Sequence, residues 1–136
     1  MSSSEEMLQA FERYRSAFNV GQRQSVLDCF VEEPFVEEPV GSTVRRGRAQ
    51  IEAVLDGLAE AGITAQIGVP SSAIAGVNNE LAVAFVATAT GQTGVRSIPA
   101  IEIFTIAPDG RIEGMRAFVS PEQLAPSGAP PEGGPE

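Results

Sequence analysis

Hydrophobic residues near the start of the chain recur at intervals of four and three, which is the spacing of one face of an α-helix. This face would consist of Met7, Phe11, Tyr14 and Phe18. Serines followed by glutamates at residues 3–6 resemble an N-cap and the acidic first turn that a helix dipole favours. Gly21 stands where a helix commonly ends. The pattern therefore predicts a first helix that directs Tyr14, the only tyrosine, into the core.

Two further helices are predicted from the apolar positions that follow. Residues 22–30 are expected to form a short helix with Cys29 as a small core residue, and its apolar contacts would be Val26, Leu27 and Phe30. Residues 48–60 are expected to form a third helix that Gly62 closes. Its buried stripe would consist of Ile51, Val54, Leu55 and Leu58.

Beyond residue 62 the pattern changes to an alternation of apolar and polar positions, which indicates β-strands. Strands are expected at residues 35–38, 63–69, 72–77, 81–90, 95–106 and 111–119. Asn78-Asn79 and Pro108-Asp109-Gly110 have the composition of tight turns. Three helices and a meandering, mostly antiparallel sheet predict an α+β fold, in which the helices cover one face of a curved sheet and enclose a cavity.

Two adjacent acids, Glu37 and Glu38, lie in an apolar strand that ends at Pro39-Val40-Gly41. Successive strand residues point to opposite faces, so only one of the two acids can point toward the core. A carboxylate against an apolar pocket carries a desolvation cost that proteins rarely tolerate without a use. The pattern predicts one inward acid without deciding which of the two it is.

A further acid, Glu102, shares a strand face with Phe104 and Ile106. Without a nearby cation, burial would raise the pKa of Glu102 and keep it protonated as a hydrogen-bond donor. The residues leave two alternatives open. Glu102 could reach water from an edge strand, and Tyr14 could be a core tyrosine with a backbone partner.

Composition excludes several classes of function. The 136 residues carry a net charge of −9, and all nine basic residues are arginines, which disfavours nucleic acids and anionic membranes as partners. Without histidine, no Ser-His-Asp triad, Cys-His pair or histidine-based zinc site can form. Without lysine, Schiff-base catalysis and a Walker-type phosphate loop are excluded as well. Carboxyl groups, one tyrosine, arginines and hydroxyls remain for catalysis.

The chain has the features expected of one cytoplasmic domain. No apolar run approaches the ~20 residues that span a bilayer, and the first residues lack the basic start and apolar centre of a signal peptide. A lone cysteine, Cys29, suits a reducing compartment. Residues 1–124 are predicted to form a single domain, followed by a disordered tail rich in proline and glycine at residues 125–136.

Several of these motifs together resemble bacterial ketosteroid isomerase, of the nuclear transport factor two-like superfamily. The resemblance extends from about residue 8 to residue 119 and rests on Arg13-Tyr14, residues 35–41, residues 47–51, Ile101-Glu102-Ile103-Phe104 and Gly110-Arg111-Ile112. It implies a cone-shaped fold, usually a homodimer, that works without a metal or an organic cofactor. It places Tyr14 at the oxyanion tyrosine, Glu38 at the base and Glu102 at the protonated acid. Both acids are glutamates where the steroid isomerases carry aspartates.

The resemblance also implies a reaction and a ligand. The reaction moves a double bond from Δ5 to Δ4 in a 3-oxosteroid through a dienolate, and the ligand is a small, hydrophobic, steroid-like ketone. The pocket is expected to be lined by Phe11, Phe18, Phe30, Leu55, Phe85, Phe104 and Phe118. Phe30 and Leu55 stand where the better-studied steroid enzymes have further tyrosines.

The same superfamily supplies two alternative functions. Polyether epoxide hydrolases and polyketide cyclases use paired acids in a similar cone, and other members only bind ligands. In a binding module, Glu38 could pair with an arginine such as Arg116.

Overall fold

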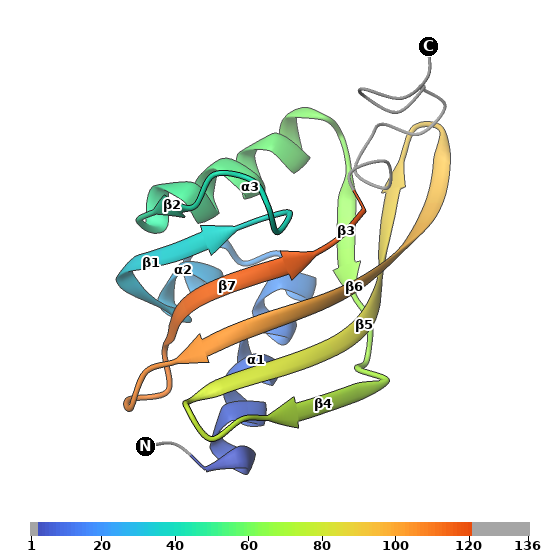
Figure 1. Cartoon of the computed structure of the whole chain (residues 1–136). Helices are drawn as coiled ribbons and strands as arrows, with labels where there is room; N and C mark the ends of the chain where they lie inside the picture. The colour runs from blue at the N-terminus through green and yellow to red at the C-terminus, as the bar shows by residue number, and fades with distance from the viewer. Residues whose placement is uncertain (1–2, 121–136) are drawn as a thin grey trace.

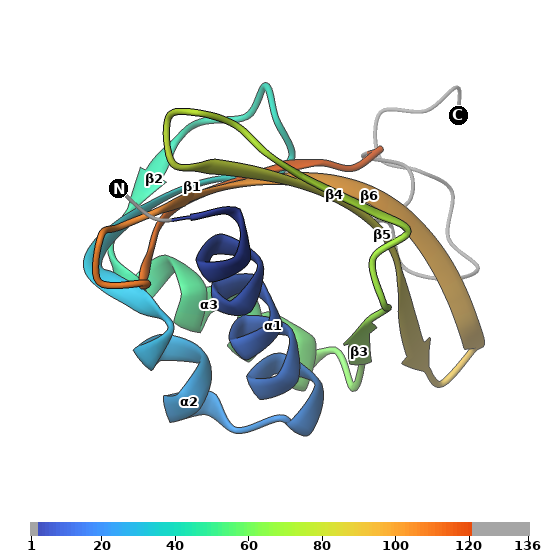
Figure 2. The same ribbon diagram turned by 90° about the horizontal axis from the view of Figure 1, so that it is seen from below.

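Three helices lie on the concave side of a curved β-sheet in the computed structural model, which describes residues 3–120 (Figures 1 and 2). The helices are α1 (Ser4–Val20), α2 (Arg23–Asp28) and α3 (Arg48–Glu60). The strands are β1 (Phe30–Glu37), β2 (Arg45–Arg46), β3 (Thr64–Ile67), β4 (Ser72–Ala75), β5 (Glu80–Gly91), β6 (Gly94–Ile106) and β7 (Ile112–Phe118). The predicted α+β class is confirmed. The predicted domain end at residue 124 and the predicted tail, residues 125–136, lie outside the described residues.

Helix α1 begins and ends at the residues that the sequence indicates. The Ser3 hydroxyl accepts a hydrogen bond from the Glu6 N–H at 3.1 Å, and the Glu6 carboxylate accepts one from the Ser3 N–H at 2.8 Å. This capping box satisfies two backbone donors that a helix start leaves unpaired. At the other end, Gly21 adopts a left-handed conformation with a φ of 84°. The helix is therefore fixed at both ends, and its buried face includes Tyr14.

The other two helices differ from expectation in detail. Helix α2 ends at Asp28, and Phe30 begins β1 instead of ending the helix, because the Cys29 carbonyl accepts a hydrogen bond from the Ile112 N–H at 2.8 Å. Helix α3 has the predicted bounds, but its predicted stripe is wrong at Val54, which is 41% exposed. Val54 lies at the border of the apolar face and faces a surface pocket.

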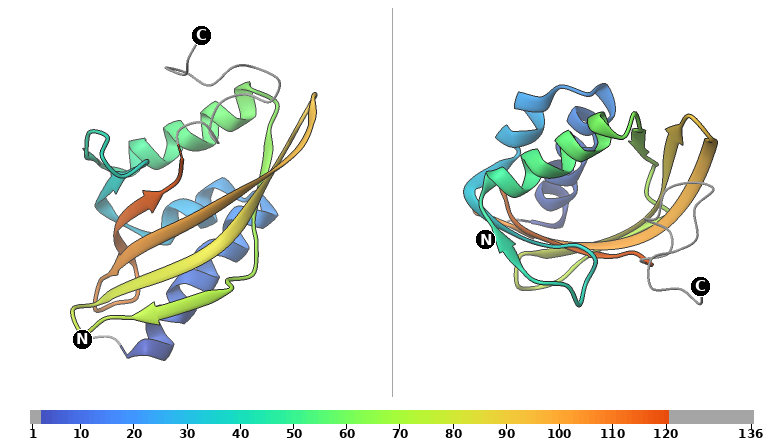
Figure 3. Two further views of the ribbon diagram at one scale, coloured as in Figure 1. Left: turned by 45° about the vertical axis from the view of Figure 1, so that its right-hand side comes forward. Right: turned by 90° about the horizontal axis from the view of Figure 1, so that it is seen from above.

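The seven strands form one sheet in the order β2-β1-β7-β6-β5-β3, with β4 also paired to β5. Strands β1 and β7 are parallel, and every other pair is antiparallel. The sheet curves around the helices, with β1 and β2 at one end and the β5–β6 hairpin at the other (Figure 3). The sheet is mixed and mostly antiparallel, and β6 is a central strand.

The register of the sheet separates an inner row of side chains from an outer one. Glu102 of β6 pairs with Val83 of β5 and Ala117 of β7, and all three residues are buried. One step along, Arg116 of β7 pairs with Glu37 of β1, and these side chains lie on the outer face. Because paired residues share a face, this register determines which acids can reach the space under the helices.

Strand β3 is held against the end of α1 by polar side chains. The Asn19 amide donates to the Ile67 carbonyl at 2.9 Å and accepts from the Ile67 N–H at 2.7 Å. Arg15 donates to the carbonyls of Ile67 and Gly68, each at 3.0 Å. These bonds satisfy backbone groups at the end of a short strand and fix β3 as a wall beside α1.

A close approach of β1 and β7 depends on Gly114. Gly114 pairs with Phe35, and the Phe35 ring occupies the space where a Cβ on residue 114 would lie. Any larger residue would displace this ring. The glycine thus lets Phe35 pack flat over β7 next to the segment that carries Glu37 and Glu38.

Candidate functional site

The two adjacent glutamates lie on opposite sides of the sheet. On the outer face, Glu37 forms an ion pair with Arg116, with 2.9 Å between Oε1 and Nε, and its Oε2 accepts a hydrogen bond from the Gly41 N–H at 2.9 Å. The Gly41 N–H and the Arg116 guanidinium lower the pKa of Glu37. Arg116 is thus the partner of Glu37, not of Glu38, and Glu38 lies on the side of the helices.

Glu38 lines a cavity of about 190 Å³ between the helices and the sheet. The cavity walls are largely apolar, and they include Phe18 of α1, Phe85 of β5 and Met115 of β7. Burial raises the pKa of Glu38. In the described part of the chain, Glu38 makes no ion pair. Its carboxyl is therefore a proton acceptor of increased basicity in apolar surroundings.

Glu102 lines the same cavity from β6 and is 8% exposed. Burial, followed by the charge of Glu38, raises the pKa of Glu102 to about 8. Its Oε1 is buried and has no hydrogen-bond partner among the described residues. Since β6 lies between β5 and β7, the edge-strand alternative for Glu102 is wrong. At neutral pH the Glu102 carboxyl is thus predominantly protonated and can donate a hydrogen bond into the cavity.

The small side chain of Ala117 lies between the two acids. The pairing of Glu37 with Arg116 places Glu38 beside Ala117, and Ala117 is in turn paired with Glu102. Two strand spacings correspond to about 10 Å between the backbones of the two acids. Because Ala117 contributes only a Cβ, both carboxyls can reach the space above it.

Tyr14 reaches the cavity from α1 and is 6% exposed. Its ring makes an edge contact with Phe30, with 5.5 Å between centroids, and also contacts Phe18 and Phe104. Burial and then the charges of Glu102 and Glu38 raise the pKa of Tyr14 well above 10. Its hydroxyl makes no hydrogen bond to any described residue, so the alternative of a core tyrosine with a backbone partner has no support in this part of the chain. The phenol remains protonated and is available as a donor.

The cavity lies where the inner row of side chains is small, at Ala87 and Ala89 on β5 and at Ala100 on β6. On β5 the inner residues change from Leu81, Val83 and Phe85 to Ala87 and Ala89. On β6 they change from the fully buried Phe104 to Glu102 and then Ala100. The helices cannot follow this loss of volume, and an apolar space therefore remains.

The residues expected to line the pocket fall into four groups. Phe18 and Phe85 line the cavity. The prediction is wrong for Phe11, Phe30 and Phe104, which do not line the cavity because they are completely buried in the core around Tyr14. Leu55 lines an adjoining groove, described below. The prediction is also wrong for Phe118, which is 46% exposed with the Arg116 guanidinium over its ring, because Ala117 next to it occupies the inner face.

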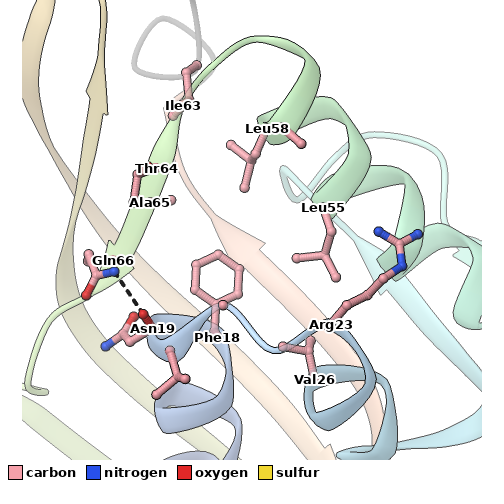
Figure 4. Close-up of a pocket in the computed structure, with 13 residues that line it drawn as sticks. Phe18, Asn19, Arg23, Val26, Leu55, Leu58, Ile63, Thr64, Ala65 and Gln66 are labelled. Atoms are coloured by element: carbon pink, nitrogen blue, oxygen red, sulfur yellow. Dashed lines mark hydrogen bonds between the residues drawn. The ribbon is translucent and has the colours of Figure 1, made fainter.

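A groove of about 350 Å³ adjoins the cavity between α1, α2, α3 and β3 (Figure 4). In this view Phe18, Leu55 and Leu58 point toward the same space, and β3 forms the opposite wall. The groove and the cavity share Phe18, Leu58, Ile63, Ala65 and Gln66. A ligand too large for the cavity alone can therefore extend toward this groove.

Sequence reasoning missed Arg96 and Gln66, which contribute polar groups to the cavity. Arg96 and Glu102 lie six residues apart in the strand predicted at residues 95–106. Because alternate strand residues share a face, this spacing alone would have placed both side chains on the inner face. Gln66 gives no comparable signal because it lies in a short alternating stretch.

Residues 3–120 contain neither a cluster of metal-binding side chains nor a helix that could span a membrane. No group of three or more histidine, cysteine or acidic side chains in this range could hold a metal ion. No helix in the same range is long and apolar enough to cross a membrane.

Known proteins with a similar sequence or a similar fold include a steroid isomerase and enzymes of the cyclase type. Over 121 residues the chain is 29% identical to a steroid Δ-isomerase of Nocardioides simplex, a match that covers 89% of this chain and 95% of that protein. The structure of SalBIII, an epoxide hydrolase/cyclase-like enzyme described in pyran ring formation in polyether salinomycin, matches with 28% identity and a TM-score of 0.76. That match covers 88% of this chain and 95% of SalBIII.

A protein from Xanthomonas campestris pv. campestris, assigned as a polyketide cyclase, matches with a TM-score of 0.74 over 85% of this chain and 91% of that one. Its identity of 16% shows a common fold alone. The resemblance to steroid isomerases is confirmed by the relative from Nocardioides simplex. The model of the SnoaL-like domain matches residues 11–115, and the chain therefore belongs to the SnoaL-like domain family.

Proposed function

We propose that this protein is a cofactor-independent isomerase that moves a double bond from Δ5 to Δ4 in a steroid-like 3-oxo compound. The observation that carries the proposal is the meeting of Tyr14, Glu38 and Glu102 at one apolar cavity. The pKa of Glu102 is about 8, whereas that of Glu38 is raised without a charged partner as a cause. Two carboxyl groups with separated pKa values suit a base and a hydrogen-bond donor.

In the proposed reaction Glu38 acts as the base. Its carboxylate removes a proton from the carbon between the ketone and the β,γ double bond, and the electron pair of that C–H bond forms a dienolate. The protonated Glu38 then returns the same proton to the γ carbon. The double bond ends in conjugation with the ketone, and no atom is gained or lost. A positioned base of this kind contributes about 10²- to 10⁴-fold to the rate.

Tyr14 and neutral Glu102 act as donors to the developing oxyanion. Both are buried, and neither the Tyr14 hydroxyl nor the Glu102 Oε1 is used by another described residue. A hydrogen bond to a developing charge strengthens in a site that excludes water. An oxyanion between these two groups would also give the buried Glu102 carboxyl the hydrogen-bond partner that its Oε1 lacks.

The size of the cavity favours a substrate that extends beyond it. A volume of about 190 Å³ is below the range of about 300–1,000 Å³ of typical ligand pockets. The adjoining groove adds apolar surface from Phe18, Leu55 and Leu58. The reacting ketone would thus lie at Tyr14 and Glu102, and the remainder of the molecule would extend out of the cavity past Ile63, which lines the cavity, this groove and the pocket beside the β5–β6 turn.

The direct test is an absorbance assay. The full-length protein is mixed with a 5-ene-3-oxosteroid, and the conjugated enone product is followed in the ultraviolet. We expect conversion well above the buffer rate and a strong loss in the Glu38→Gln variant. A wild-type rate equal to that of this variant would sink the isomerase proposal for steroids.

A second candidate, epoxide opening, is favoured by one observation. Glu38 also lines a pocket of about 360 Å³ on the far side of α3, whose walls include Ser42, Thr43 and Gln50. This pocket has hydroxyl and amide groups in its walls and offers room for water or a substrate hydroxyl beside the base, which an epoxide hydrolase or cyclase needs. Incubation with an apolar epoxide, followed by mass spectrometry of the diol or cyclic ether, distinguishes this reaction. Tight ligand binding without either product would indicate a binding protein.

We also propose that the protein acts in the cytoplasm, and that it forms a homodimer, as the resemblance to the steroid isomerases implies. The outer face of the sheet supports the dimer because it exposes large apolar side chains at Ile74, Val86, Ile101 and Phe118. Exposed apolar residues gathered on one face are typical of contact surfaces. Light scattering at micromolar concentration measures the mass, and a monomer would contradict this assignment.

A further inference from the structure

Arg96 is a cation on the inner face of β6, and no acidic residue within the range 3–120 pairs with it. It lines the cavity and also an outer pocket of about 220 Å³ beside the β5–β6 turn, so it lies where the cavity opens. Among the described residues, Arg96 makes no ion pair and no hydrogen bond. Arginine retains its charge in every protein environment, and this charge therefore needs an external partner or water.

The immediate neighbours of Arg96 on the inner face are small or apolar. Its cross-strand partner is Ala89, and Ala89 is paired in turn with Ala65 of β3. Along β6 the next inner residue is Ile98. None of these three neighbours, Ala65, Ala89 and Ile98, is acidic, although acidic residues outnumber basic ones in the whole chain, which has a net charge of −9. The guanidinium thus stands free at the edge of an apolar space, which is the arrangement that suits an anionic group on an otherwise apolar ligand.

We infer that Arg96 binds a carboxylate at the end of the substrate opposite the reacting ketone. Glu102 and Arg96 lie on the same face of β6, and their separation along the strand is about 20 Å at ~3.4 Å per residue. A ligand that contacts both therefore carries its ketone and its acid at opposite ends of an elongated apolar body. This inference rests on the proposed function for the position of the ketone, and it narrows the substrate class to keto acids.

The test compares binding of acids with binding of their methyl esters. The first pair is a 3-oxo-4-ene steroid with a side-chain carboxylate and its ester, and the second pair is an open-chain, long-chain oxo acid and its ester. The steroid pair already has its double bond in conjugation, so no turnover is required. Affinities are measured by calorimetry on the full-length wild type, Arg96→Gln, Arg96→Lys and Arg111→Gln.

We expect Arg96→Gln to weaken binding of at least one acid by about 10- to 100-fold, which is the usual contribution of a hydrogen-bonded charge, and to leave its ester unchanged. Arg96→Lys should restore part of the loss because it keeps the charge. Arg111→Gln changes the net charge equally at an exposed turn, where Arg111 pairs with Asp109, and should behave as wild type. Equal losses for acid and ester, equal affinities in wild type and Arg96→Gln, or no binding of either acid to wild type would overturn the assignment.

The outcomes separate this inference from the proposed reaction. If the open-chain acid shows an Arg96-dependent preference while no steroid is bound or isomerised, Arg96 remains the carboxylate site and the steroid proposal fails. If a neutral 5-ene-3-oxosteroid is isomerised but Arg96→Gln does not distinguish acids from esters, the isomerase stands and the carboxylate site is rejected.

Discussion

Replacing Glu38 by glutamine should lower kcat for a 5-ene-3-oxosteroid by about 10²- to 10⁴-fold, because the amide cannot accept the proton that the base removes. The substitution keeps the shape of the side chain. Burial raises the pKa of Glu38, so a neutral amide at this position is not expected to destabilise the fold. The rate is measured from enone absorbance at saturating substrate, and a thermal melt of each protein checks the fold.

The neighbouring acid provides a matched control. Glu37→Gln removes the same charge one residue away, but on the outer face, where Glu37 pairs with Arg116. Its kcat should remain close to that of wild type, because the ion pair lies on the outer face and the Glu37 side chain does not reach the cavity. Similar losses in Glu37→Gln and Glu38→Gln would show that the effect comes from general charge or stability, and would contradict a specific base at residue 38.

Removing the oxyanion donors should have the second largest effect. Tyr14→Phe and Glu102→Ala are each expected to lower kcat by about 10²- to 10³-fold, the usual cost of losing one such donor. Glu102→Gln should lose less, because its amide still presents N–H groups to the same space. Loss of activity in Tyr14→Phe with full retention in Glu102→Ala would restrict the donor role to Tyr14.

The pH profile separates a donating acid from a packing role for Glu102. Its pKa is about 8, so the carboxyl donates a hydrogen bond below that pH and repels a developing oxyanion above it. In wild type kcat/KM should therefore decrease as the pH rises past about 8. Glu102→Gln has no proton to lose there, and its profile should stay level until other groups titrate. An identical decrease in both proteins would argue against Glu102 as the titrating donor.

The same pKa has a consequence for stability. Between pH 4.5, the ordinary pKa of a glutamate, and about 8, the folded chain keeps a proton on Glu102 that the unfolded chain releases. The contribution of Glu102 to the free energy of unfolding is thus fully present below pH 4.5, decreases across this window and is level above it. Glu102→Gln should flatten this decrease in urea unfolding measured from pH 5 to 9. Parallel curves for the two proteins would contradict a raised pKa.

Sequence periodicity alone was sufficient to predict much of the site. Helical spacing directed Tyr14 inward, and alternation in the longest strand placed Glu102 on its apolar face. Both signals are local, since they depend only on neighbours within one element. The choice between Glu37 and Glu38 is different. It depends on Arg116, which is far along the chain and reaches Glu37 only through the parallel pairing of β1 with β7.

The wrong burial predictions for Phe118 and Val54 also arise from tertiary packing, which local sequence patterns do not reveal. Phe118 is an aromatic residue at the end of the last strand. Ala117, the residue before it, lies on the inner face of β7, and Phe118 therefore points outward. Val54 belongs to an apolar helix stripe whose edge meets a surface pocket instead of the sheet. In both cases tertiary packing decides burial for a residue whose type alone predicts a core position.

The shortening of inner side chains along β5 and β6 has a consequence for how the substrate range could change. The shape of the cavity depends on the lining alanines at residues 87, 89 and 100 more than on any opening of the backbone. Each is one substitution away from a larger apolar residue, and none carries the proposed chemistry. Selection could therefore change the accepted ligand one methyl group at a time while the base and its donors stayed in place. Relatives with one fold and different substrates would then be expected to differ first at such positions.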